Sequence, residues 1–203
     1  MRPGTERRSV PPTATDTVRL LAIGGSTRGE SGSAHALADA VAVARSAGAD
    51  VTVVSGRDLM LPIYDPASPY RSAGAQDLLA AVRAADALVI SSPGYHGTLS
   101  GMIKNALDYL EDLRGDRRPY LDGVPVGCIA VAHGWQTAVG TLHTLRTSVH
   151  ALRGWPSPLG VAINAAAPGS NGQLAETSDK LATMTGQVVE FALASKLMTQ
   201  RSG

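Results

Sequence analysis

Short apolar runs alternate with longer amphipathic stretches through most of this chain, and this alternation limits the possible folds more than any other feature. The runs are almost continuously apolar, which is typical of strands buried on both faces of a parallel sheet. Strands that alternate with helices indicate consecutive βαβ units. The expected strands cover residues 18–23, 51–54, 87–91, 126–132 and 159–163.

The stretches between these runs carry apolar residues at helical spacing, so we expect each to form a helix with one buried face. Ser100 stands where it can cap the helix that follows the third strand. We interpret the apolar stripes as core packing and assign them no other role. Their members are Ala34, Leu37, Ala38, Val41 and Ala44; Leu78, Leu79, Val82 and Ala85; Ile103, Ala106, Leu107, Leu110 and Leu113; Leu142, Leu145, Val149 and Leu152; and Leu181, Met184 and Val188 with Phe191 or Ala192.

Five parallel strands with intervening helices predict a three-layer, doubly wound α/β sandwich with strand order 2-1-3-4-5. Such sheets bind ligands beyond the carboxyl ends of the strands, near the point where the strand order reverses. The loops after the first, third and fourth strands therefore form the candidate site. We expect one domain over residues 17–203, preceded by a flexible polar tail at residues 1–16.

Composition and charge exclude several classes of protein. A formal net charge of +1 provides no basic field for nucleic acid, and no apolar run approaches the roughly 20 residues of a membrane helix. The single cysteine, Cys128, excludes an intramolecular disulfide, and no His or carboxylate spacing predicts a metal site. Arg7 and Arg8 precede prolines and polar residues instead of an apolar stretch, which argues against twin-arginine export and favours a cytoplasmic protein.

A glycine-rich segment, residues 24–33, separates the first strand from the first helix. Backbone N–H groups at the start of a helix attract anions, and the helix dipole adds positive potential. The segment contains neither Gly-Lys-Ser/Thr nor G-x-G-x-x-G, so it favours a terminal monophosphate over a pyrophosphate. A polar turn with a capping serine is the alternative. The candidate phosphate ligands are Ser26, Thr27, Arg28, Ser31 and Ser33.

Two segments resemble signatures of the NAD(P)H-dependent FMN reductase family, whose members are flavodoxin-like flavoproteins. Residues 25–33 are similar to G-S-x-R-x-x-S-x-N, with Ser33 at the position of the asparagine. Residues 92–108 resemble P-x-Y-N/H-G-S-x-P/S-G-x-L-K-N-A-x-D, and residues 133–138 are loosely similar to the loop after strand four. The resemblance spans about residues 18–164 and implies a flavodoxin-like fold that binds FMN.

In that family, the loop after strand three lies against the flavin ring, and the loop after strand four closes the other side. We therefore expect Gly94 and Gly97 to allow backbone approach to the ring, and Tyr95 and His96 to lie near it. The alternatives are that Tyr95 is an aromatic side chain packed within the loop and that His96 is a hydrogen-bonded loop residue. Trp135 is expected either to cover the ring or to fill the core below its loop. The ring contacts implied by the resemblance are Pro93, Gly94, Tyr95, His96, Gly97, His133, Gly134 and Trp135.

The implied activity is transfer of hydride from NADPH or NADH to bound FMN, followed by electron transfer to a small-molecule acceptor such as a flavin or a quinone. Because the reaction needs two stacked rings, no catalytic acid or base is predicted. A quinone or azo reductase with the same FMN, or a non-catalytic electron carrier, is the alternative. Related enzymes are oligomers, so a homodimer or homotetramer is expected.

Several other charged residues have simpler interpretations. Lys104 and Asp108 are four residues apart, which predicts an ion pair on one helix. Arg71, Arg117 and Arg118 could contact the 2′-phosphate of NADPH, but we expect them to be solvated.

Overall fold

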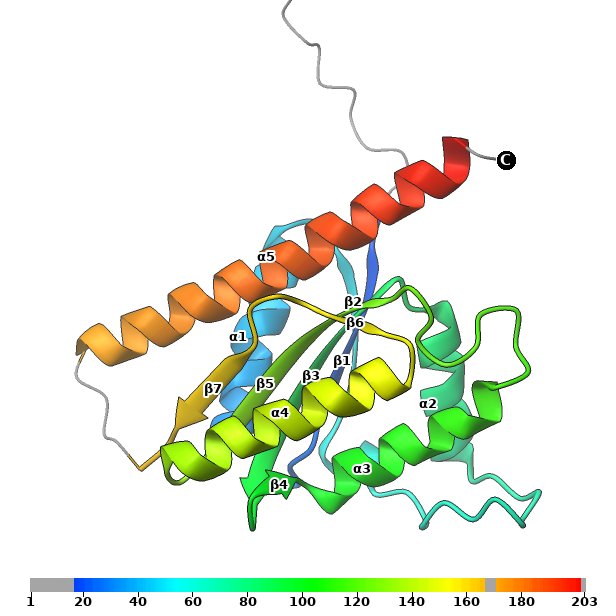
Figure 1. Cartoon of the computed structure of the whole chain (residues 1–203), viewed down its shortest axis with the longest axis horizontal. Coiled ribbons are helices and arrows are strands. Elements are labelled where there is room, and N and C mark those ends of the chain that lie inside the picture. The colour runs from blue at the N-terminus through cyan, green and yellow to red at the C-terminus, as the bar shows by residue number, and fades with distance from the viewer. Residues whose placement is uncertain (1–16, 167–170, 202–203) are drawn as a thin grey trace, which may run out of the picture.

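The computed structural model describes residues 17–166 and 171–201, and its helices cover both faces of a central sheet (Figure 1). The predicted tail at residues 1–16 lies outside the described residues. The elements in chain order are β1 (Arg19–Gly24), α1 (Gly32–Ser46), β2 (Asp50–Ser55), the 3₁₀ helix η1 (Gly56–Leu59), α2 (Ala73–Ala84), β3 (Ala87–Tyr95), β4 (Thr98–Leu99), α3 (Gly101–Asp108), the 3₁₀ helix η2 (Tyr109–Leu113), β5 (Pro125–Ala132), α4 (Trp135–Ala151), β6 (Trp155–Pro156), β7 (Val161–Asn164) and α5 (Asn171–Arg201).

The sheet confirms the parallel, doubly wound arrangement but not the predicted number of strands. Its order is β2-β1-β3-β5-β6, and β1, β2, β3 and β5 are parallel, as expected for the first four predicted strands. The expectation of five strands is wrong, because the described sheet has seven. The fifth position is shared by β6 and β7, which both pair with β5, and β4 adds an antiparallel pairing with β3.

Proline explains why the fifth position is divided. Pro156 and Pro158 flank Ser157, and a proline has no N–H group to donate to a neighbouring strand. The N–H groups of Trp155 and Ser157 still donate to the carbonyl oxygens of Val124, just before β5, and Val126 of β5, but strand pairing resumes only at Val161. The Arg146 guanidinium of α4 donates to the Ser157 carbonyl oxygen at 2.6 Å, so a side chain satisfies the backbone at the break.

The predicted loop after the third strand is a tight hairpin. Strand β3 continues to Tyr95, and a two-residue turn at His96 and Gly97 leads directly into β4. Both turn residues have positive φ, 51° and 88°, which is the backbone that two-residue hairpins favour. Helix α4 packs against this turn, because a Cβ atom on Gly140 would lie 3.1 Å from the Gly97 carbonyl oxygen.

Two separate hydrophobic cores lie on the two faces of the sheet. Side chains of α2, α3, η2 and α4 pack on one face, and those of α1 and α5 pack on the other. Figure 1 shows α1 and α5 on the opposite side of the sheet from α2, α3 and α4. Most of the predicted stripes are buried, including Leu37, Leu78 and Val188. Ala38 is an exception and faces solvent, and of the two alternatives on the last helix Ala192 is buried whereas Phe191 is 41% exposed.

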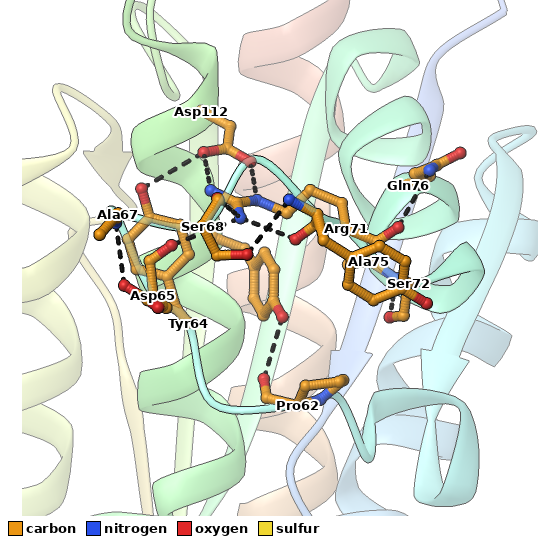
Figure 2. A network of polar contacts seen from close by, with 12 residues as sticks. Pro62, Tyr64, Asp65, Ala67, Ser68, Arg71, Ser72, Ala75, Gln76 and Asp112 are labelled. Carbon is orange, nitrogen blue, oxygen red and sulfur yellow. Dashed lines mark hydrogen bonds and ion pairs between the residues drawn. The ribbon is translucent and has the colours of Figure 1, made fainter.

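Arg71 is not solvated, which corrects the expectation from sequence. Its guanidinium pairs with Asp112 of η2, with 2.8 Å between Nη2 and Oδ1, and Nη1 donates to the Ser68 carbonyl oxygen at 2.7 Å (Figure 2). The hydrogen bond from Arg71 lowers the pKa of Asp112. The Tyr64 hydroxyl donates a hydrogen bond to the same carboxylate at 3.3 Å. The Arg71 guanidinium lies over the Tyr64 ring, with 4.9 Å between the guanidinium carbon and the centre of the ring. These contacts fasten residues 60–72 to η2.

Asn105 of α3 fastens the same segment from its other end. Its side-chain oxygen accepts the Tyr64 N–H at 2.8 Å, and its nitrogen donates to the Pro62 carbonyl oxygen at 2.9 Å.

Arg117 and Arg118, the other two arginines that were expected to be solvated, differ from each other. Arg118 donates to the carbonyl oxygens of Ala85, at 2.7 Å, and Val82 at the end of α2, whereas Arg117 is exposed as expected.

Candidate functional site

The three loops that the sequence singled out meet at one edge of the sheet. They follow the carboxyl ends of β1, β3 and β5, which are neighbouring strands in the sheet. Figure 1 shows these ends, with β4, on the side of the sheet away from the C-terminal part of α5. The topology therefore brings residues 26–33, 93–97 and 133–135 to one edge, where a doubly wound sheet binds ligands.

The glycine-rich loop is folded partly by its own hydroxyl groups. Ser31 caps α1, since its Oγ accepts the Ala34 N–H at 3.2 Å, and it lies 3.2 Å from the Oγ of Ser33. Ser26 Oγ accepts the Arg28 N–H at 3.2 Å. The capping serine of the alternative interpretation is thus present in Ser31, and it coexists with further donors in the same loop.

The remaining donors of this loop suit a phosphate monoester. The first N–H groups of a helix have no carbonyl partner within it, and in α1 these include Gly32 and Ser33. Thr27 and Arg28 are exposed beside them, so a hydroxyl and a guanidinium are available to an anion. The one carboxylate in the loop, Glu30, pairs with His35 of α1 at 3.1 Å. The donor set therefore fits the phosphate of FMN.

Ser100 connects this loop to the hairpin, a role that its place in the sequence does not indicate. Its Oγ accepts the Ile103 N–H at 3.3 Å, which confirms it as the cap of α3, and donates to the Gly25 carbonyl oxygen at 3.1 Å. Its own N–H donates to Ser92 Oγ of β3 at 3.0 Å. A Cβ atom on Gly25 would lie 2.7 Å from Ser100 Oγ, so glycine is needed for this close approach.

Two buried serines in the middle of β3, where its apolar run ends, were also missed. Ser91 Oγ donates to the Ser33 carbonyl oxygen at 2.8 Å, and its own carbonyl oxygen accepts the Gly25 N–H at 2.9 Å. Ser92 receives the bond from Ser100 described above. The signal that could have found them is two consecutive serines at the end of an apolar strand, because buried hydroxyl groups need partners.

The predicted ring contacts in the hairpin differ in exposure. Pro93 is buried, whereas Tyr95 is 48% exposed and His96 and Gly97 face solvent, so neither predicted side chain packs into the core. Gly94 has a structural reason to be glycine, since a Cβ atom there would lie 2.6 Å from Thr141 Oγ1 of α4. Close packing of α4 thus explains this glycine without a flavin.

The third loop is held by an asparagine that the sequence analysis did not select. Gly134 has a φ of 108°, a conformation that favours glycine, and its N–H donates to Asn164 Oδ1 at 2.7 Å. This N–H is therefore already bonded within the protein. His133 is exposed, and Trp135, the first residue of α4, is 53% exposed, so it does not fill the core beneath the loop.

A cleft of about 390 Å³ adjoins the glycine-rich loop of residues 26–33, hereafter the phosphate loop, and is otherwise lined mainly by α1 and β2. Its lining includes Gly25, Ser33, Leu37 and Val53, and none of the described residues of the hairpin or the third loop. The predicted ring contacts therefore do not form the wall of this cleft.

Comparisons with known proteins agree with the predicted family. The family model for NADPH-dependent FMN reductase matches residues 18–168. An NADPH azoreductase of Bacillus sp. (strain OY1-2) is 33% identical over 90 residues, which cover 44% of this chain and 47% of that protein. An FMN-dependent NADPH-azoreductase of Staphylococcus aureus (strain USA300) is 37% identical over 89 residues, 44% of each chain. The matches span less than half the length of these curated relatives.

Solved structures share the fold at low sequence identity. An oxidoreductase from Corynebacterium diphtheriae superposes with a TM-score of 0.71 at 18% identity, covering 88% of this chain and 98% of that one. A flavoenzyme NAD(P)H:(acceptor) oxidoreductase from Paracoccus denitrificans gives 0.66 at 21% identity, covering 87% and 97%. Among the described helices, none has the length and apolar character needed to cross a membrane.

Proposed function

Because the chain belongs to the NADPH-dependent FMN reductase family, we propose that it binds FMN at the carboxyl edge of β1, β3 and β5 and acts as an NAD(P)H-dependent oxidoreductase. The observation that supports this most directly is the convergence of the three loops. Ser100 joins two of them by hydrogen bonds to Gly25 and Ser92, so the phosphate loop and the hairpin hold a defined relation to each other.

In this proposal the chain holds the cofactor at two places. The N–H groups of Gly32 and Ser33, with Thr27 and Arg28, bind the phosphate, and the exposed hairpin and Trp135 flank the ring. Ser26, Ser31, Pro93, Gly94, His133 and Gly134 complete the proposed contact set. Bound FMN supplies the redox chemistry, which is acceptance of hydride from a nicotinamide and delivery of electrons to an acceptor.

The protein's own part is binding and orientation. Helix α1 directs the positive end of its dipole at the phosphate, and the hairpin, braced by α4, provides a fixed edge for the ring. Tyr95 and Trp135 present aromatic surfaces that keep water from one side of a bound ring. No side chain is assigned a proton-transfer role, because hydride transfer between stacked rings needs none.

We further propose an azo compound or a quinone as the acceptor. Two relatives are named azoreductases, and Tyr95, His96 and Trp135 are exposed, so a second flat molecule can reach the proposed ring site. The assembly proposed with it is a cytoplasmic homodimer or homotetramer, which rests on the family resemblance. A non-catalytic carrier of electrons is the competing function.

The test is an anaerobic titration of the purified protein. We expect a visible flavin spectrum that bleaches when NADPH or NADH is added and returns when an azo dye or quinone is supplied. A flavin spectrum that stays oxidised with both nicotinamides would support the carrier instead. A preparation that neither contains nor takes up FMN would refute the proposed cofactor.

A paired substitution tests the phosphate site separately. Arg28→Gln is expected to weaken FMN binding about 10-fold, because a charge-assisted hydrogen bond contributes about 1.5 kcal/mol. Arg57→Gln, at an exposed arginine of η1, is the matched control and should leave FMN affinity unchanged. Equal affinities for the two variants would argue against Arg28 as a phosphate ligand.

A further inference from the structure

A cleft of about 570 Å³ lies between β6 and α5, away from the three loops of the candidate site. We propose that this cleft binds the chain's own Pro11-Pro12 segment. The segment belongs to residues 1–16, which lie outside the described residues.

The cleft has the surface that proline-rich segments use. Trp155 and Phe191 line it with their ring centres 5.3 Å apart, and they are 58% and 41% exposed. Exposed aromatic rings in a groove are the common recognition surface for polyproline helices, which enter the groove with little loss of chain entropy. The exposed rings of Trp155 and Phe191 therefore provide the kind of surface on which two consecutive prolines can pack.

Strand β6, at this edge of the sheet, is not suited to pair with an additional strand in the cleft. Strand β6 ends the sheet, and the N–H groups of Trp155 and Ser157 donate inward, to the carbonyl oxygens of Val124, just before β5, and Val126 of β5. The alternate positions, which would direct N–H groups outward, are Pro156 and Pro158 and have none. An added strand would find no donors there, whereas a polyproline segment makes no ladder hydrogen bonds and needs none.

The position of Thr17 brings the segment within reach. Its carbonyl oxygen accepts a hydrogen bond from Lys196 Nζ of α5 at 2.9 Å, so the chain enters the fold beside this helix. Lys196 and Phe191 are five residues apart, or about 7.5 Å along a helix. Pro12 precedes Thr17 by five residues, and an extended chain of that length spans about 16 Å. A second hollow, lined by Lys196 and Pro125, is adjacent to the cleft, because Pro125 also lines the cleft.

Charge is also complementary. Glu190 is the one charged residue among the described residues that line the cleft, and it is exposed. Arg7 and Arg8 lie just before the Pro-Pro pair in the sequence. Because a short tether gives an effective concentration of about a millimolar, weak aromatic and ionic contacts are enough to keep the segment bound.

Disulfide trapping in the full-length protein tests the proposal. Val10→Cys is combined with Gln187→Cys, in the cleft, or with Ala194→Cys, which is exposed on the same helix and closer to Lys196. Cys128 is buried and stays out of the reaction. If the segment is docked, the disulfide from position 10 to position 187 forms at least about fivefold faster than the disulfide to position 194, and it forms within one chain. The reason is that docking raises the local concentration of the position 10 thiol near position 187. An undirected tail would prefer position 194 or show no preference, and this result would overturn the proposal.

Matched substitutions identify what holds the segment. Replacing Pro11 and Pro12 together by alanine, or Trp155 by alanine, should remove the preference for position 187. Trp135→Ala, which alters the other exposed tryptophan, should preserve it. A preference that survives Trp155→Ala would refute aromatic recognition. Disulfides that form only between two chains would show that the cleft takes a second copy's segment, which would also overturn the proposal.

Discussion

Substitution of Ser100 by alanine is expected to destabilise the protein much more than loss of an ordinary helix cap. Ser100 is 4% exposed and its Oγ makes two hydrogen bonds, one from the Ile103 N–H and one to the Gly25 carbonyl oxygen. Loss of a capping serine costs about 1 kcal/mol, and a buried carbonyl left without a partner costs a further 1–3 kcal/mol. The sum is about 3 kcal/mol, which lowers the melting temperature of a domain of this size by about 6–12 °C.

Ser72→Ala provides a matched control. Ser72 caps α2, since its Oγ accepts the Ala75 N–H at 3.3 Å, the same distance as in the cap of Ser100. The structure shows no second hydrogen bond from the Oγ of Ser72. The control should therefore lose only about 1 kcal/mol. Urea denaturation measures both free energies of unfolding, and the difference of about 2 kcal/mol isolates the bond to Gly25.

Cofactor binding adds a second measurement. Because Ser100 connects the phosphate loop to the hairpin, Ser100→Ala should also release FMN more readily, whereas Ser72→Ala should not. Equal losses of stability in the two variants would show that the hydrogen bond to the Gly25 carbonyl oxygen adds nothing to the stability of the protein. Unchanged FMN affinity in Ser100→Ala would refute the role of this serine in organising the site.

Three other predictions concern single residues. Burial raises the pKa of Asp86, but hydrogen bonds from Arg19 and Lys196 outweigh it and hold the pKa at about 2. The ionised carboxylate therefore contributes about 1–2 kcal/mol to the free energy of unfolding after solvent screening. This contribution should be complete above pH 4 and lost as the pH falls toward 2, whereas acid denaturation of Asp86→Asn should show no such loss. Gly134→Ala should cost about 1–3 kcal/mol in urea denaturation because of its φ of 108°, and a loss below 0.5 kcal/mol by the same measurement would contradict this. Burial raises the pKa of Cys128 to about 12, so a thiol reagent at pH 8 should label the denatured protein rapidly and the native protein hardly at all.

The arrangement of elements was largely predictable because it depends on local patterns. The order of the first four strands, the cap at Ser100 and the ion pair of Lys104 with Asp108 all follow from spacing along the chain. Division of the fifth strand was missed, although Pro156 and Pro158 carry the signal. A proline that interrupts an edge is recognised only when the edge itself is known.

The candidate site was predictable in location but not in its internal bonds. The three loops meet as expected, because parallel strands end at one edge. The bonds made by Ser91, Ser100 and Asn164 join residues far apart in sequence, and no periodicity reports such contacts. Arg71 shows the same limit, since its partner Asp112 follows it by 41 residues.

The sheet with a separate core on each face divides the protein into compartments that can change independently. A larger or smaller side chain in α1 or α5 alters packing on one side only, because the strands stand between it and α2, α3 and α4. Substitutions such as Val188→Ala and Leu78→Ala should therefore add in their effects on unfolding. Over evolutionary time, one face can accumulate replacements while the other, which braces the hairpin, stays the same.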